Sequence, residues 1–159
     1  MIKVTLITLG RLKEKYLTAA VDEYKKRLSR YCNLQIVEIE PVRLSDNPSR
    51  TEIDNALDRE SELILKKVPD NSTVISLCVE GKEFSSESFA DKIKEQSAYG
   101  KNIAFIIGSS YGLSERIKKG SDIRLSVSQM TFPHQLFRVM LLEQIYRAFK
   151  INEGSTYHK

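Results

Sequence analysis

The sequence predicts an α/β domain with a largely parallel sheet and helices on both of its faces. Short segments rich in β-branched and aliphatic residues alternate with longer segments whose apolar residues recur at helical spacing. The 159 residues are 41% hydrophobic and 29% charged, which fits one domain over residues 1–159 without a linker. Because a helix between two strands returns the chain to the same end of the sheet, these strands are expected to run parallel.

In the first half of the chain, turn and cap residues separate four expected elements. Gly10 closes the first strand, and Pro41 ends the second. Ser49 and Glu52 have the spacing of a capping box, which opens a charged helix after a loop. The four elements are a strand over Ile2–Leu9, a helix over Lys13–Ser29, a strand over Leu34–Ile39 and a helix from Ser49 to about Val68.

In the second half, a β-branched and largely apolar segment is expected to form a strand buried on both faces. Gly81 is expected to turn the chain after it, and Ser85 or Ser86 to cap the next helix. The elements of this half are a strand over Thr73–Val79, a helix to about Tyr99, a strand over Asn102–Ile107, a short helix over Ser114–Lys119, a short strand over Ile123–Val127 and a final helix over Pro133–Ile151.

Several classes of protein are disfavoured by what the sequence lacks. No apolar run approaches the ~20 residues of a membrane span, and the start has no signal-peptide pattern, so a cytosolic protein is expected. Cys32 and Cys78 fit neither a zinc template nor a CxxC redox pair, and no metal site is expected. No Gly-x-Gly-x-x-Gly or Gly-Lys-Ser/Thr loop is present, which argues against a Rossmann cofactor site and an NTPase.

Charge is distributed unevenly along the chain, whose net charge is +4. Residues 1–50 contain 10 Lys/Arg and 6 Asp/Glu, residues 51–100 contain 6 and 11, and residues 101–159 contain 9 and 4. Basic ends around an acidic middle suggest a polyanionic partner, although solvated helix faces would give the same counts.

Two loops are candidates for a ligand site. Gly108-Ser109-Ser110-Tyr111-Gly112 follows the fourth strand, and residues 126–132 follow the fifth. In parallel sheets ligands bind beyond the carboxyl ends of strands, where glycines let a backbone approach closely. The two loops could wrap a ligand together, and two ordinary turns are the alternative.

The final helix carries more apolar surface than one sheet can cover. Ten of the fourteen residues over Leu136–Phe149 are apolar and point in nearly every direction around the helix. This predicts a two-fold homodimer through the final helix, with Leu142 as an example of an interface position. Glu143 and Arg147 are spaced to pair within the helix, and Arg138 and Arg147 could instead face a phosphate.

The chain has two histidines. His134 stands at the start of the final helix, where the helix dipole favours its neutral form; capping or packing is the alternative to a binding role. His158 stands in the terminal Tyr157-His158-Lys159, where fraying is the default.

Several segments of the chain carry a recognisable pattern, from Gly10-Arg11-Leu12-Lys13-Glu14-Lys15-Tyr16 to the last residue. Its most specific part is the block over Met130–Ala148, MTFPHQLFRVMLLEQIYRA. With this pattern the chain resembles the bacterial RlmH family, SPOUT-class methyltransferases that modify N3 of a pseudouridine in 23S ribosomal RNA. The chain departs from the family pattern at Ser109, where a second glycine is usual.

The resemblance implies a C-terminal trefoil knot, a homodimer and binding of S-adenosyl-L-methionine (AdoMet) in the knotted loops. Folding physics alone would not predict a knot, because threaded chains are rare. The residues implied to contact AdoMet are Leu77, Gly108, Leu125, Val127, Ser128, Gln129, Met130, Thr131 and Phe132.

The resemblance also places Tyr157, His158, Lys159 and Arg147 on the RNA side of the site, with His134 as a further substrate contact. Since a sulfonium methyl is already activated, the remaining tasks are in-line positioning and removal of the N3 proton. His158 could accept that proton, and Lys159 could stabilise the imide anion or hold a phosphate. Which residue does which job stays open.

Two other functions compete with this one. A non-catalytic dimer that binds the ribosome would explain the charge and the apolar helix, but not the two ligand-type loops. A SPOUT enzyme acting on tRNA is disfavoured, because such relatives commonly carry additional RNA-binding domains. The absence of an accessory domain favours an assembled ribosome over free 23S rRNA as substrate.

Overall fold

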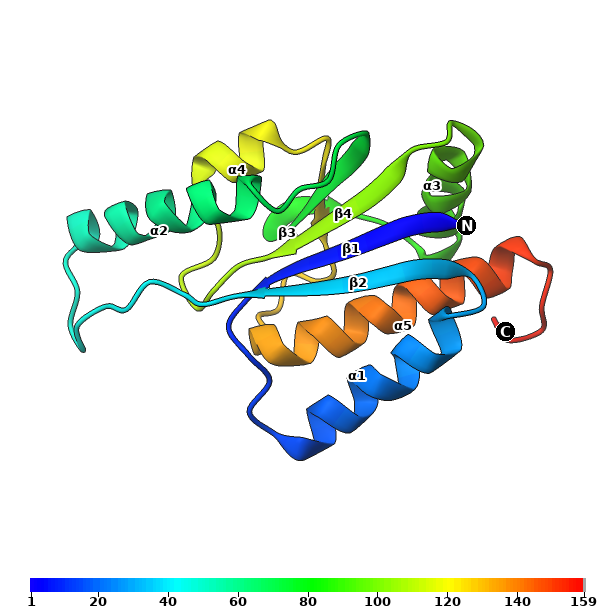
Figure 1. The fold of residues 1–159 in the computed structure, drawn as a ribbon, viewed down its shortest axis with the longest axis horizontal. Coiled ribbons are helices and arrows are strands. Elements are labelled where there is room, and N and C mark those ends of the chain that lie inside the picture. Colours follow the sequence, from blue (N-terminus) through cyan, green and yellow to red (C-terminus); the bar gives the residue numbers. More distant parts are fainter. Residues whose placement is uncertain (159) are drawn as a thin grey trace.

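A computed structural model describes residues 1–158 and has a five-stranded sheet with helices on both faces (Figure 1). All four strand pairings are parallel. The ten expected elements are confirmed in type and order: β1 Ile2–Leu9, α1 Lys15–Leu28, β2 Cys32–Ile39, α2 Arg50–Leu65, β3 Ser72–Glu83, α3 Ser86–Ala98, β4 Asn102–Ile107, α4 Glu115–Gly120, β5 Ile123–Ser126 and α5 His134–Asn152.

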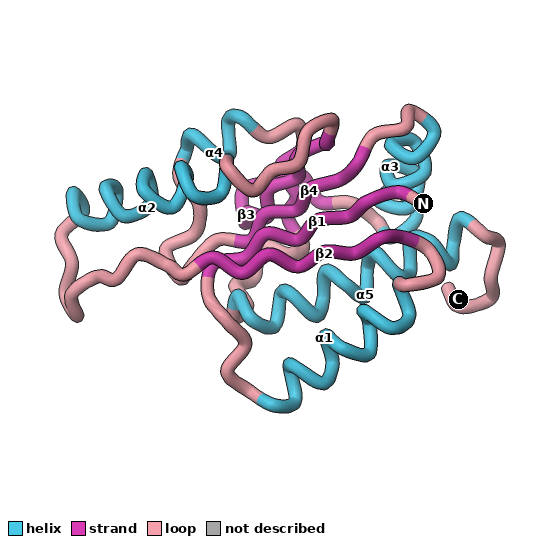
Figure 2. Tube along the Cα trace, in the orientation of Figure 1, coloured by secondary structure: helices cyan, strands magenta, loops and turns pink. Residues whose placement is uncertain are grey.

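The strand order is β2-β1-β4-β3-β5, so the fourth strand in sequence lies at the centre of the sheet. Successive side chains on a strand point to opposite faces. Leu6 accordingly joins a large core beneath α1, α3 and α5, whereas Ile7 joins a smaller core beneath α2 and α4. Figure 2 shows α1 and α5 side by side on the first of these faces.

Serine caps begin three of the helices. The side chains of Ser49, Ser85 and Ser114 each accept a hydrogen bond from the backbone N–H three residues later. Each cap satisfies one of the backbone donors that a helix start leaves unpaired. Ser85 rather than Ser86 is therefore the cap of α3.

Strand β3 corrects two expectations. Gly81 does not turn the chain but lies inside β3, where the register against β5 shifts between Leu77 and Lys82. A Cβ on Gly81 would lie 2.7 Å from the carbonyl oxygen of Arg124, so glycine is needed for the close approach of two backbones. Only the first half of β3 is largely buried; its second half extends to the surface.

Helix α5 lies between α1 and α3, and those neighbours cover much of its apolar surface. Leu142 is fully buried inside the single chain (0% exposed), so it is a core residue and not an interface position. Leu136 and Met140 are half-buried and belong to neither core among the residues described. The predicted dimer therefore rests on a narrower face than the sequence indicated, and it stays a prediction. No helix within residues 1–158 is long and apolar enough to span a membrane.

Candidate functional site

A cavity of about 560 Å³ lies at the carboxyl ends of β3, β4 and β5, and is called here the first cavity. Its walls come from the end of β3, the two loops that the sequence singled out and the first turn of α5. Its volume falls within the ~300–1,000 Å³ typical of small-molecule sites. The lining residues are Leu77–Glu80, Ile107–Ser110, Gly112, Leu113, Lys118, Leu125–Ser128, Thr131–His134 and Phe137.

Most residues implied to contact AdoMet line the first cavity. They are Leu77, Gly108, Leu125, Val127, Ser128, Thr131 and Phe132. Gln129 and Met130 do not line it; both are exposed, Met130 at 72%. The turn explains their direction, because Ser128 Oγ accepts a hydrogen bond from the Met130 N–H at 3.0 Å while the Ser126 hydroxyl donates to the Ser128 carbonyl at 3.1 Å.

The loop after β4 is closed by its own backbone. Gly112 N–H donates to the Ser109 carbonyl at 2.8 Å, and Gly112 has φ +80°, which glycine adopts readily. A Cβ on Gly108 would lie 2.4 Å from the Gly112 carbonyl oxygen, so Gly108 permits the loop to fold back on itself.

Ser109 fits this loop without strain, because its φ is negative. Its hydroxyl donates to Glu60 Oε1 at 3.2 Å, a contact that glycine could not make. The departure from the family pattern therefore leaves the loop intact and adds a link to helix α2.

His134 begins α5 and lines the wall of the first cavity. Burial lowers the pKa of its imidazole, and the positive charges of Arg138 and Lys13 lower it further. The imidazole is therefore neutral at pH 7, as the sequence predicted, but burial rather than the helix dipole is the leading cause. A neutral imidazole can accept a proton.

A second cavity of about 300 Å³ lies beside the first, at the carboxyl ends of β1, β2 and β4. The two cavities share Ser109, Ser110 and His134. In the sequence, only the basic residues Arg11 and Lys13 after the first strand point to this second cavity. Its other lining residues are Leu9–Arg11, Lys13, Pro41, Val42, Leu44, Ile53, Ala56, Leu57, Glu60, Tyr111 and Gln135.

Arg138 does not face a phosphate. Its side chain is almost fully buried (2% exposed for the residue), and Nη1 pairs with Glu38 at 2.7 Å while Nη2 donates to the Gly10 carbonyl at 3.1 Å. The guanidinium therefore ties α5 to the ends of β1 and β2.

The described part of the terminal segment is anchored rather than frayed. Tyr157 donates its hydroxyl to Glu143 Oε2 at 3.1 Å, and the Arg147 guanidinium lies 4.7 Å from the centre of its ring. Arg147 also pairs with Glu143 at 2.7 Å, as the spacing predicted. Lys159 lies outside the described residues.

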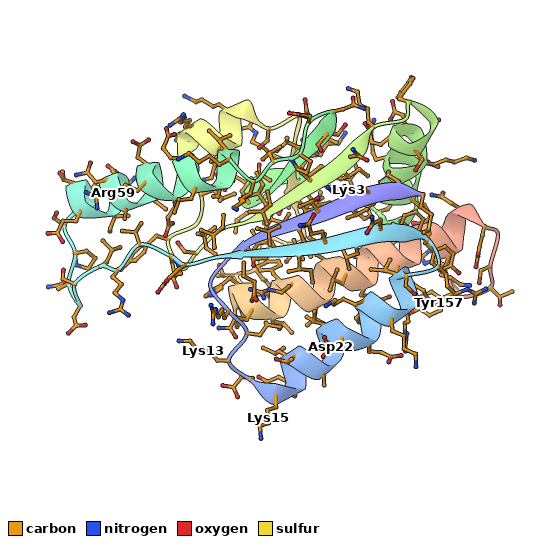
Figure 3. The ribbon with its side chains drawn as sticks, in the orientation of Figure 1. Lys3, Lys13, Lys15, Asp22, Arg59 and Tyr157 are labelled. Atoms are coloured by element: carbon orange, nitrogen blue, oxygen red, sulfur yellow. The ribbon has the colours of Figure 1, made fainter. Side chains whose placement is uncertain are left out.

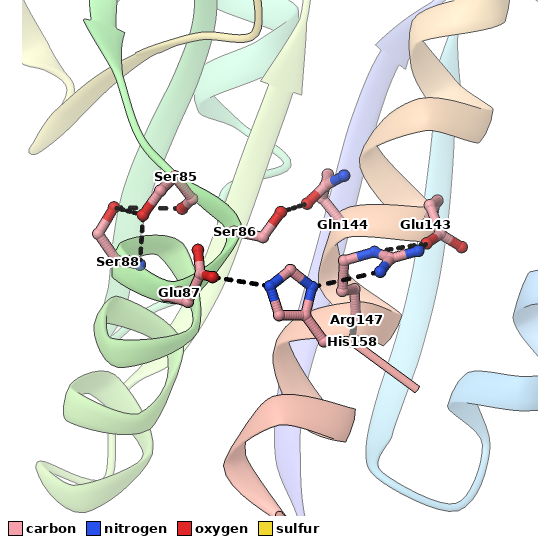
Figure 4. A network of polar contacts seen from close by, with 8 residues as sticks. All are labelled: Ser85, Ser86, Glu87, Ser88, Glu143, Gln144, Arg147 and His158. Carbon is pink, nitrogen blue, oxygen red and sulfur yellow. Dashed lines mark hydrogen bonds and ion pairs between the residues drawn. The ribbon is translucent and has the colours of Figure 1, made fainter. Parts of the chain in front are cut away.

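Both ring nitrogens of His158 are engaged (Figure 4). Nε2 lies 2.7 Å from Glu87 Oε1 on α3, and Nδ1 lies 3.3 Å from Arg147 Nη1. Because a guanidinium can only donate, Nδ1 accepts and Nε2 carries the hydrogen directed at the carboxylate. In this arrangement His158 has no free nitrogen with which to take a proton.

The tail and the first cavity lie at opposite ends of α5. Figure 3 shows Lys13 near the start of that helix and Tyr157 near its far end. Arg147, the tail's main anchor, stands 13 residues after His134, which is about 20 Å along a helix. Within one chain, Tyr157 and His158 therefore do not reach the predicted cofactor residues. Within residues 1–158, no three His, Cys, Asp or Glu side chains cluster in a way that could hold a metal ion.

Comparison with known proteins identifies the family. The model described as "Predicted SPOUT methyltransferase" matches residues 2–158. The chain belongs to the SPOUT methyltransferase family. The resemblance seen in the sequence is thereby confirmed, and the family implies the knotted C-terminal path.

Two relatives that share one name each match almost the whole chain. The ribosomal RNA large subunit methyltransferase H of Clostridium kluyveri is 52% identical over 157 residues, which are 98% of this chain and 99% of the relative. The protein of that name from Clostridium botulinum is 51% identical over the same share of each chain.

Solved structures support the fold. A methylase family protein from Neisseria gonorrhoeae superposes with a TM-score of 0.56 at 10% identity, over 99% of this chain and 87% of that one. A methylase family protein from Haemophilus influenzae gives a TM-score of 0.54 at 14% identity, over 96% and 67%. Proteins with very different sequences thus share this fold.

Proposed function

We propose that this protein is an AdoMet-dependent methyltransferase that methylates N3 of a pseudouridine in 23S rRNA on the assembled ribosome. The observation that carries the proposal is the half-identity, over nearly the whole length of both chains, to relatives named ribosomal RNA large subunit methyltransferase H. The first cavity, built from the loops that the family motif contains, supports it.

The residues of the first cavity suit AdoMet. Ile107, Leu113 and Phe137 offer apolar walls for an adenine ring, and the two loops offer backbone donors and acceptors. Lys118 and Glu80, paired at 2.5 Å, put one charge of each sign on the lining, which suits the carboxylate and ammonium of the methionine part. When bound, AdoMet supplies an electrophilic methyl group.

The chain must also remove the N3 proton. His134 is suited to this because its imidazole is neutral, half-buried and located on the wall of the first cavity. Accepting the proton would place a positive charge on His134 near Arg138 and Lys13, and passing it on to water would follow readily. His158 could do the same only after leaving Glu87 or Arg147.

A homodimer would let the tail take part. The half-buried Leu136 and Met140 lie one turn apart on α5, which suits contact with the same face of a second copy. A two-fold axis across α5 makes the two helices antiparallel, so the tail of each copy lies toward the cavity end of the other. Each active site would then combine one chain's cavity with the other chain's tail.

Methyl transfer to ribosomes tests the proposal. Assembled ribosomes and, separately, free 23S rRNA from a strain that lacks this enzyme would be incubated with the protein and labelled AdoMet, and the product nucleotide would be mapped by mass spectrometry. We expect one methyl group on N3 of a pseudouridine, and faster transfer to assembled ribosomes than to free 23S rRNA. Binding of AdoMet by calorimetry without any transfer to RNA would contradict the proposed substrate, and no AdoMet binding would favour the non-catalytic ribosome-binding alternative.

A further inference from the structure

The second cavity lies next to the first along the same edge of the sheet. The first opens over β4, β3 and β5, the second over β4, β1 and β2, and the β4 loop with His134 forms the wall between them. A molecule in one cavity is therefore a neighbour of a molecule in the other. At about 300 Å³ the second cavity is at the low end for a ligand site, and suits one nucleotide rather than a whole cofactor.

The lining of the second cavity has the chemistry of a nucleotide site. Arg11 and Lys13 supply two positive charges where β1 ends. Tyr111 is 49% exposed and offers a ring against which a base can stack. Leu9, Val42 and Ala56 provide apolar surface below.

Glu60 is the unusual member of this lining. Only 4% of the residue is exposed, and no Lys or Arg of the described chain lies within ion-pair distance of its carboxylate. Oε2 accepts from the Val42 N–H at 3.0 Å and Oε1 from the Ser109 hydroxyl at 3.2 Å. Burial raises the pKa of this carboxyl group, against the effect of those two hydrogen bonds.

A buried carboxylate without a cation is costly, and it is expected to have a further hydrogen-bond donor when the site is in use. Each carboxylate oxygen can accept two hydrogen bonds, so Glu60 has acceptor capacity left on both. A donor that enters the second cavity would find it.

We propose that the second cavity holds the RNA nucleotide that receives the methyl group, with Glu60 accepting a hydrogen bond from an N–H of its base. Arg11 and Lys13 contact the adjoining phosphates, and the base stacks on Tyr111. The inference rests on the proposed function and adds to it the place and the selectivity of the substrate.

The selectivity follows from the chemistry of pseudouridine. Its base is joined to the sugar through carbon, so both ring nitrogens carry hydrogen, whereas uridine has only the N3 hydrogen. When N3 faces the wall at His134, the N1–H points in a different direction and can donate a hydrogen bond to another acceptor. The Glu60 carboxylate can therefore accept a hydrogen bond from the N1–H of pseudouridine, whereas uridine has no N1–H to donate.

Glu60→Gln tests this selectivity, because the amide keeps the size of the side chain but loses acceptor capacity. The value of kcat/KM would be measured on two kinds of ribosome. One has pseudouridine at the target position, and the other, from a strain that lacks the pseudouridine synthase, has uridine there. We expect Glu60→Gln to lower kcat/KM for ribosomes with pseudouridine by about 10- to 100-fold, the scale of a lost hydrogen bond to a charged group. The kcat/KM for ribosomes with uridine should not change. Asp58→Asn on the exposed side of the same helix is the control and should keep the preference.

Variants at the rim test the cavity independently of Glu60. Arg11→Ala together with Lys13→Ala should raise KM for ribosomes about 10-fold or more and lower its dependence on salt, while Arg50→Ala, an exposed residue outside both cavities, should not. Tyr111→Leu should weaken ribosome binding and Tyr99→Leu should not. If Glu60→Gln lowers the melting temperature, these rim variants still test whether the second cavity binds the target nucleotide.

AdoMet affinity, measured by calorimetry, should be the same in all of these variants. If the wild type transfers no methyl group to either ribosome, the proposed function is wrong. If it does, and Glu60→Gln keeps the preference for pseudouridine while the rim variants keep KM, the target nucleotide binds elsewhere and only this inference is overturned.

Discussion

Ionisable groups have different surroundings at the two ends of α5. At its start, His134 is kept neutral by burial and by nearby positive charge, on a wall between two cavities. In its second half, Glu143 and Arg147 pair with each other and hold Tyr157 and His158 in a hydrogen-bonded network. The first end therefore borders two cavities, and the second end holds the chain's own tail.

This difference indicates how the two ends would work together. A rigid helix fixes them about 20 Å apart, so one chain cannot apply both to the same atom. If both ends serve one reaction, they must come from two copies.

The largest effect is expected from filling the first cavity. Val127→Trp places an indole into the space between the two loops, and should weaken AdoMet binding by at least ~100-fold, because the ligand and the ring would overlap. Met130→Trp, on the exposed side of the same loop, should bind AdoMet nearly as the wild type does. Calorimetry measures both, and wild-type affinity in Val127→Trp would place the cofactor elsewhere.

Removing the tail should affect turnover and spare the cofactor. Deletion of Tyr157, His158 and Lys159 should leave AdoMet affinity within a few-fold and lower turnover on ribosomes by at least ~100-fold, the scale of losing one acid or base group. Single-turnover rates with saturating AdoMet measure this. Full turnover would exclude the tail from the reaction and leave His134 as the remaining base.

Mixing the tail-deleted variant with Val127→Trp tests whether the cavity and the tail of one active site come from different chains. In a random mixture, about half of the dimers pair a tail-deleted chain with a Val127→Trp chain, and one of their two sites has both an open cavity and a tail. We therefore expect about a quarter of the wild-type rate to return. A mixture as inactive as its components would show that each site uses its own chain.

Charge on the uncovered face of α5 should weaken the dimer. Met140→Glu puts a carboxylate where the dimer would bury it, and should reduce association at least ~10-fold. Leu63→Glu, on α2 at the other face of the sheet, is the matched control and should not. Sedimentation at micromolar concentration distinguishes them, and a monomeric wild type would overturn the dimer.

The smallest effect concerns pH. Because the pKa of His134 is lower in the folded chain than its ordinary value of ~6.5, the unfolded chain binds the proton more readily below that pH, and stability falls as the pH falls through this window. His134→Gln should lose less stability than the wild type between pH 7 and pH 5, by less than about 4 °C in Tm. Equal losses in the two proteins would mean that His134 is not held neutral by its surroundings.

The fold could be predicted from sequence because its signals are local. Alternation in Ile2–Leu9, the cap at Ser49 and the apolar run at Asn102–Ile107 each specify an element without reference to the rest of the chain. Gly81 was misread because a glycine within a strand and a glycine in a turn look alike in sequence. Only the approach of the Arg124 backbone, from 43 residues later, distinguishes them.

The site was predictable only in part, for a related reason. The first cavity is formed by loops whose glycines and position after strands are visible in sequence. Glu60 gave no signal, because a charged residue on a helix is normally solvated, and the partners of its buried carboxylate, Val42 and Ser109, come from distant parts of the chain. The opposite error occurred at Leu142, where an apolar residue was assigned to a partner although neighbouring helices already cover it.

The central place of β4 has a consequence for synthesis on the ribosome. β4 forms the only bridge between the β2-β1 pair and the β3-β5 pair in the described sheet. A nascent chain of the first 100 residues therefore carries β1 and β3 with open edges facing one another, and those edges are prone to wrong pairing. The sheet can close only after Asn102–Ile107 has left the exit tunnel, so folding of the whole domain is expected late, when two thirds of the chain has already emerged.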